Sequence, residues 1–157
     1  MDPINLSTAL AALFSTIKAL TEPIWNHYNR KRQFGETARI VRGTIEQSGM
    51  TARLIEEYFN RKAPRSPQHQ LEISVKISHL FEELTLKKAA LSANHDLYNL
   101  ASEALLAIDQ LKRVFEKYSS KENDSFHSLG VSDTAASIAI KLDRIQSEWT
   151  DATKNGR

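Results

Sequence analysis

The most regular feature of the chain is a hydrophobic pattern with steps of three and four residues, the spacing that lines up one face of an α-helix. It runs through five segments, which are separated by polar or proline-containing joints. The helices predicted from it cover residues 6–24, 34–59, 71–91, 97–118 and 135–149. The pattern therefore predicts an all-α protein, an antiparallel four-helix bundle with an accessory fifth helix.

Proline, glycine and capping residues mark the expected boundaries of these helices. Pro23 predicts a kink or a short break near residues 21–22, and Gly35 predicts a C-cap or a joint. The stretch 119–130 is polar and is expected to form a loop. Helix starts are expected at Ser66 with Pro67, at Asn94, and at Ser132 or Asp133.

The segment after Pro67 carries two hydrophobic patterns at once. Its apolar residues alternate with polar ones over 71–77, which is strand spacing, and they also recur at helix spacing over 73–91. We predict a helix, because the second pattern is too long for an ordinary strand and no other segment offers a strand to pair with.

Composition narrows the class of protein further. The 157 residues include only five glycines and four prolines, and no cysteine, which excludes a disulfide scaffold and any cysteine-ligated metal site. The length predicts a single bundle domain over residues 1–150, followed by a polar tail or linker over 151–157. The absence of a basic, signal-like N-terminus favours a cytoplasmic protein.

No sequence motif of an enzyme is present: the chain has no glycine-rich phosphate loop, no HExxH and no GxSxG. The nearest approach to a metal-binding pair is His79 with Glu82 and Glu83, which we expect on an outer helix face. Asp109 is likewise interpreted as surface charge and not as a general acid. We therefore predict no catalytic residues, no metal, no cofactor and no enzymatic activity.

The first helix is unusual because residues 3–17 carry no charge. One interpretation is a central helix that is buried on most sides of the bundle. The other is a membrane-active segment that leaves the bundle and enters lipid. In that case the contacts would come from its large apolar residues, Leu6, Leu10, Leu13, Phe14 and Ile17.

A basic, aromatic-containing stretch follows this helix. Trp25 and Tyr28 precede five basic residues, Arg30, Lys31, Arg32, Arg39 and Arg42. They are either ordinary solvated charges or a binding site for anionic lipid headgroups or an acidic partner, since aromatic and basic side chains suit a membrane interface. Nucleic acid is disfavoured as a partner, because the net charge of the whole chain is only +2.

Met1, Asp2 and Pro3, followed at once by an apolar helix rich in small residues, resemble the start of fungal HeLo and HeLo-like domains. The layout is similar to cell-death four-helix bundles, including those of the necroptotic pseudokinase and of plant helper immune receptors. The resemblance implies a membrane-targeted executioner whose first helix is released on homo-oligomerisation. It also implies that Asp2 and residues 4–20 belong to the membrane-active segment.

Taken together, these patterns favour a non-enzymatic signalling or cell-death bundle that is recruited from the cytoplasm to anionic phospholipid membranes. The alternative is a protein-interaction adaptor or regulatory bundle without membrane activity. In the adaptor the first helix is simply part of the hydrophobic core. The two hypotheses therefore differ in whether Leu10 and Leu13 are buried.

Overall fold

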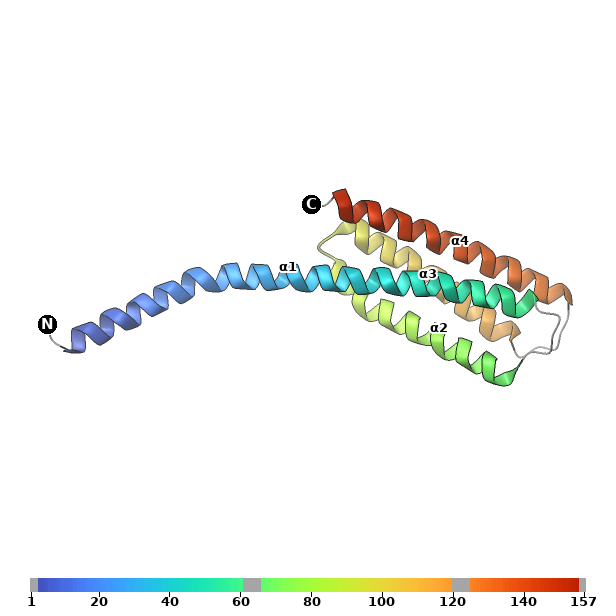
Figure 1. Ribbon diagram of the computed structural model, residues 1–157, viewed down its shortest axis with the longest axis horizontal. Helices are drawn as coiled ribbons and strands as arrows, with labels where there is room; N and C mark the ends of the chain where they lie inside the picture. Colours follow the sequence, from blue (N-terminus) through green and yellow to red (C-terminus); the bar gives the residue numbers. More distant parts are fainter. Residues whose placement is uncertain (1–2, 61–65, 120–124, 156–157) are drawn as a thin grey trace. The chain divides into compact units, whose positions relative to one another are not determined.

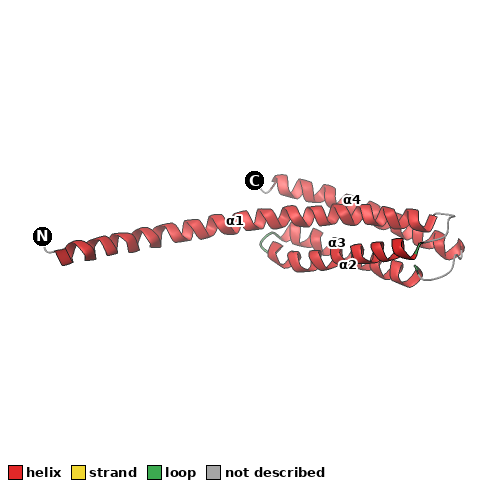
Figure 2. Cartoon of the chain, turned by 60° about the horizontal axis from the view of Figure 1, so that its bottom comes forward, coloured by secondary structure: helices red, strands yellow, loops and turns green. Residues whose placement is uncertain are grey.

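The computed structural model of the chain describes residues 3–60, 66–119 and 125–155, and within these ranges the protein is all-α, as predicted. Figure 2 shows helices and no strand in the described ranges. In chain order the elements are α1 (Pro3–Asn60), α2 (Pro67–Lys88), the short 3-10 helix η1 (Ala89–Leu91), α3 (His95–Tyr118) and α4 (Ser125–Asn155).

Helix α1 joins the two segments that the hydrophobic pattern separates. It continues as helix through Pro23 and Gly35, so a break near residues 21–22 and a C-cap at Gly35 are wrong, whereas the boundary between the two compact units of the chain falls directly after Glu36, one residue beyond Gly35. Pro23 removes one N–H donor and its ring crowds the carbonyl four residues earlier, yet strong helix formers such as Ala19 and Leu20 precede it and the helix continues. The described ranges consequently hold four α-helices, and an accessory fifth helix is not confirmed among them.

Helix α2 confirms that the ambiguous third segment is helical. Ser66 has an extended backbone at the N-cap, and Pro67 follows at the first helical position, as predicted, although the Ser66 side chain makes no capping hydrogen bond. The helix spacing selects the buried face, whose residues are Ile73, Ile77, Leu80 and Leu84. Half of the alternating pattern over 71–77 is left on the outside of the helix.

The starts of α3 and α4 differ in how well the sequence predicts them. Asn94 caps α3 as expected, since its side-chain oxygen accepts a hydrogen bond of 3.1 Å from the backbone N–H of Leu97. The N-cap predicted for the last helix at Ser132 or Asp133 is wrong, because α4 already begins at Ser125. Ser132 is instead buried, and its hydroxyl donates to the carbonyl of Glu56 in α1.

The described helices divide into two compact units, residues 1–36 and residues 37–157. The first unit holds the N-terminal part of α1. The second holds the rest of α1 together with α2, α3 and α4, whose ribbons lie side by side (Figure 1). The predicted single domain over 1–150 stays a prediction, while part of the predicted tail is helical, because α4 continues to Asn155.

The second unit is a helical bundle around a continuous apolar core. The buried face of α1 in this unit keeps the predicted steps of three and four residues: Ala38, Val41, Ile45, Ser48, Ala52, Ile55 and Phe59. Tyr58 and Phe59 of α1 contact Phe115 of α3, with ring centroids 5.8 and 6.2 Å apart. Trp149 of α4 is also fully buried, so all the helices of the unit contribute large side chains to the core.

Polar contacts and one close approach tie α1 to its neighbours in this bundle. The hydroxyl of Thr44 donates a hydrogen bond of 2.9 Å to Glu83 in α2. Arg53 forms an ion pair with Asp143 in α4. Gly49 lies directly against α4, since a Cβ at this position would stand 3.4 Å from the Asp143 carboxylate.

Candidate functional site

The most distinctive surface of the first unit is an apolar stripe along α1. We define the N-terminal stripe as Leu10, Leu13, Ile17, Leu20 and Ile24, whose exposed fractions lie between 49% and 72%. Large aliphatic side chains are normally covered, and contiguous exposed apolar surface marks an interaction site. Within the first unit these side chains are exposed to solvent.

The residues predicted as membrane-active lie on this same part of α1. Leu10, Leu13, Phe14 and Ile17 are all exposed, and Phe14 reaches 71%. Leu6 belongs to the helix, but its side chain lies outside the described set, and Asp2 lies outside the described residues altogether. The structure therefore brings the described members of the prediction together on one helix, in the solvent.

Two exposed aromatic side chains continue the apolar surface toward the basic residues. Trp25 and Tyr28 place their ring centroids 6.4 Å apart, with the ring planes inclined by 31°. Together with Ile24 they line a shallow hollow on the helix, to which Lys18 and Thr21 also contribute. Glu22 lines it as well, so the hollow combines apolar and aromatic side chains with one basic and one acidic group. Exposed aromatic rings of this kind suit a membrane–water interface.

The five predicted basic residues are all exposed, but they belong to different units. Arg30, Lys31 and Arg32 lie in the first unit, whereas Arg39 and Arg42 lie in the second. Within the described part of the chain, no ion pair joins any of the first three to a carboxylate. We call Arg30, Lys31 and Arg32 the basic triplet, and its charge is available to an anionic ligand.

A second exposed apolar surface lies between α1 and α2 in the bundle. Leu71 and Val75, one turn apart on α2, are more than 60% exposed and line a groove with Leu80 of α2 and Gln47 of α1. Our reasoning from the sequence missed this groove. The alternation of apolar residues over 71–77 could have revealed it. A helix that buries Ile73 and Ile77 leaves the other apolar residues of this pattern in solvent.

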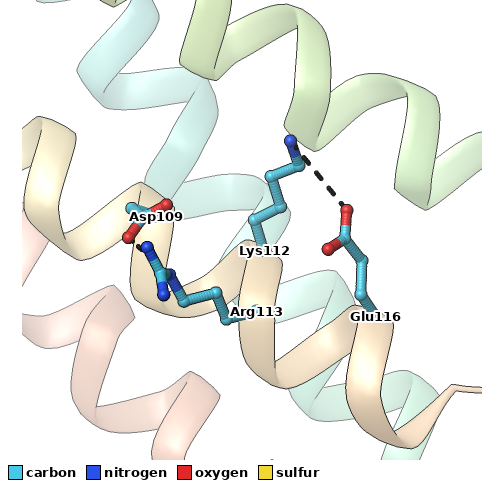
Figure 3. A network of polar contacts seen from close by, with 4 residues as sticks. All are labelled: Asp109, Lys112, Arg113 and Glu116. Carbon is cyan, nitrogen blue, oxygen red and sulfur yellow. Dashed lines mark hydrogen bonds and ion pairs between the residues drawn. The ribbon is translucent and has the colours of Figure 1, made fainter.

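Two ion pairs lie along the surface of α3. Figure 3 shows Arg113 facing Asp109, with the guanidinium Nε 2.7 Å from the carboxylate. Lys112 points toward Glu116, at an N–O distance of 3.9 Å. Each pair is separated by four residues, the spacing that stabilises a helix modestly. Asp109 thus has a structural partner on its own helix.

The described residues also bear on metal binding and on membrane crossing. Among these residues, no group of three or more histidine, aspartate or glutamate side chains is placed to hold a metal ion. His79 and Glu82 are both exposed on α2, and Glu83 accepts the hydrogen bond from Thr44. No described helix combines the length and the apolar content that crossing a bilayer requires.

Comparison with known proteins adds no relative. No family model matches the chain, and neither the curated proteins nor the solved structures contain a significant match. What the chain does must therefore be inferred from its own residues and surfaces. The N-terminal stripe, the Trp25–Tyr28 pair and the basic triplet, all within residues 10–32 of one helix, are the surfaces that most need an explanation.

Proposed function

We propose that the chain is a non-enzymatic, membrane-associating signalling module, and that residues 10–32 of α1 form its membrane contact. The observation that carries this proposal is the exposure of the N-terminal stripe. Five large aliphatic side chains stand in water along one helix face. Burying such a face in the headgroup–acyl boundary of a bilayer gains the transfer free energy of the buried apolar surface.

The order of residues along this helix also supports membrane association. Apolar side chains come first, Trp25 and Tyr28 follow, and the basic triplet comes directly after them. Aromatic rings favour the interface, and each basic group near an anionic surface contributes about 1 kcal/mol. An anionic phospholipid membrane is therefore the partner that the proposal names, and a cytoplasmic protein recruited to that membrane is the corresponding location.

Residues 37–157 are proposed to act as the regulatory body of this module, an antiparallel four-helix bundle. The pairing of residues supports the direction of the helices: Thr44 contacts Glu83, whereas Tyr58, later in α1, contacts His69, earlier in α2. A cell-death role remains the proposal that the resemblance to HeLo-like and related bundles implies, with homo-oligomerisation on activation.

The two tryptophans of the chain offer a direct test. Trp25 is 64% exposed and Trp149 is buried at 1%. On addition of phosphatidylserine-containing vesicles, the fluorescence of the intact chain should shift to the blue as Trp25 leaves water. The matched control is Trp25→Phe, which keeps only Trp149 and should show no shift. An unchanged spectrum of the intact chain at low salt would contradict the proposal.

A protein-interaction adaptor is the second candidate, and the groove between α1 and α2 favours it. Leu71 and Val75 offer the i, i+4 apolar contacts by which a groove receives an amphipathic helix. In this alternative Leu71→Glu abolishes the signalling output while vesicle binding is absent from the start. The two candidates are thus separated by which surface, stripe or groove, is sensitive to a charge.

A further inference from the structure

The N-terminal stripe follows a seven-residue period over residues 10–24. In the heptad notation a to g, the a positions are Leu10, Ile17 and Ile24, and the d positions are Leu13 and Leu20; the apolar pattern ends at the next d position, His27. Hydrophobic residues at a and d are the pattern by which two or more helices wind around one another. A helix that faces only solvent has no need of such a seam.

From this pattern we infer that the N-terminal stripe pairs in solution with the same stripe of a second copy of this chain, as a parallel two-stranded coiled coil. The residue types at the seam support the number of strands. β-Branched isoleucine at a, at Ile17 and Ile24, with leucine at d, favours two parallel helices over three or four.

The seam also continues in the same register as a packed interface of the bundle. The next a positions that are apolar, Ala38, Ile45 and Ala52, are buried in the second unit, as are Val41 and Ile55 at d. There the stripe is covered by neighbouring helices. In the first unit the same register carries larger residues at the a positions, and the side chains of the stripe are exposed, so a helix from another copy would complete the pattern.

The positions that flank the seam favour an identical partner. From residue 14 to residue 28, the e and g positions are Phe14, Thr16, Thr21, Pro23 and Tyr28, none of which is charged. Charges at e and g normally select the partner and its orientation. Here they neither repel an identical helix nor provide a pattern that selects a different one, and Pro23 lies outside the a/d seam.

Electrostatics limits the coiled coil at its C-terminal end. Lys31 occupies an a position, and Arg30 and Arg32 lie beside it, so a parallel pair brings two copies of the basic triplet together. A single lysine at a fixes the register and the number of strands at a loss of stability. Because salt screens this repulsion, added salt strengthens the pairing, the opposite of its effect on binding to anionic lipid.

Sedimentation equilibrium of the full chain tests the inference. At micromolar concentration and moderate salt we expect the mass of two chains. Leu20→Asn, which places an amide in the seam, should reduce the mass to one chain. The matched control is Ala19→Asn, at a c position one residue away, which should keep the mass of two. A one-chain mass for the unmodified protein overturns the inference. An equal fall in mass for the Leu20→Asn and Ala19→Asn variants overturns it as well.

Disulfide trapping tests the orientation, since the chain has no cysteine of its own. On oxidation, Leu20→Cys should give a linked dimer, because identical d positions face one another in a parallel pair, and Ala19→Cys should not. A linked dimer that forms only between Leu10→Cys and Leu20→Cys chains indicates antiparallel helices and overturns the inference. A single-chain mass with intact vesicle binding would assign the stripe to lipid alone and leave the proposed function standing.

Discussion

Trp25 and Tyr28 lie one turn apart on α1, and their ring centroids are separated by 6.4 Å. Neither ring is covered, and the basic triplet begins two residues after Tyr28. The pair therefore joins the apolar and the charged parts of the proposed membrane contact. We expect the two rings to set the depth at which the helix lies in the interface.

Removing either ring should weaken vesicle binding without affecting the bundle. We expect Trp25→Ala to lower the affinity for anionic vesicles roughly tenfold, about the loss of 1–2 kcal/mol of buried apolar surface. Cosedimentation with vesicles measures the affinity, and circular dichroism checks the fold. Leu106→Ala, an equally exposed side chain on α3, serves as the control and should bind like the unmodified chain.

Reversing the charge of the basic triplet should remove the preference for anionic lipid. The triple variant Arg30→Glu, Lys31→Glu and Arg32→Glu loses three attractive charges and gains three repulsive ones, so binding to anionic vesicles should fall at least a hundredfold. The control is the double variant Lys141→Glu and Lys154→Glu on α4, where exposed charges are also reversed. Comparable loss in the control would show that only the overall charge matters.

Substitutions in the core and in the N-terminal stripe should differ in their effect on the free energy of unfolding. Phe115 is buried against Tyr58 and Phe59, so Phe115→Ala should lower the free energy of unfolding by about 3–5 kcal/mol. Leu13 is exposed in the single chain, and Leu13→Ala should change the free energy of unfolding of the second unit by no more than about 0.5 kcal/mol. Urea unfolding followed by circular dichroism measures both. A large loss for Leu13→Ala would mean that the bundle covers the stripe.

Removing the helix cap at Asn94 should lower the free energy of unfolding by an amount between those expected for Phe115→Ala and Leu13→Ala. Its side chain accepts the Leu97 backbone N–H, so Asn94→Ala should lower the free energy of unfolding by about 1 kcal/mol. Asn94→Asp, which keeps the acceptor, should preserve it. Ser66→Ala is a useful comparison, because Ser66 makes no capping hydrogen bond and the same substitution should have little effect on α2.

Locking the inferred coiled coil should compete with membrane binding, because both use Leu13 and Leu20. An oxidised Leu20→Cys dimer should therefore cosediment with vesicles less than the same protein after reduction. Binding that is equal in the two redox states would show that lipid and the second copy use different faces. Oxidation of the Ala19→Cys variant controls for the reagent itself.

The success and failure of the predictions from sequence have specific physical reasons. Every segment with steps of three and four residues lies in a helix, because burial on one face forces this spacing, but residues 6–24 and 34–59 were predicted as two helices and form one. The same spacing did not reveal whether a partner covers the face, and so Leu10 and Leu13 were compatible with both a core and a surface. The break at Pro23 was wrong because the residues on both sides of it are helical in one helix of 58 residues, so the local cost of the proline, about 3 kcal/mol, does not end the helix.

Boundaries and surface features were predicted less well than helices. Ser132 has the residue type of an N-cap, but its position follows a turn of helix that already buries Val131. The groove at Leu71 and Val75 was missed because an apolar residue on a helix is first assigned to the core. Tertiary packing decides such cases, and one sequence by itself does not contain the positions of the neighbouring helices.

The most direct test of the account is cosedimentation and dye release with liposomes, comparing Leu10→Glu/Leu13→Glu with Leu86→Glu/Leu106→Glu. All four leucines are exposed, so both double variants should stay folded. We expect the unmodified chain and the Leu86→Glu/Leu106→Glu variant to bind anionic liposomes, more weakly as the salt concentration rises. The Leu10→Glu/Leu13→Glu variant should not bind. Equal behaviour of the two variants, or no binding by the unmodified chain, would contradict the account.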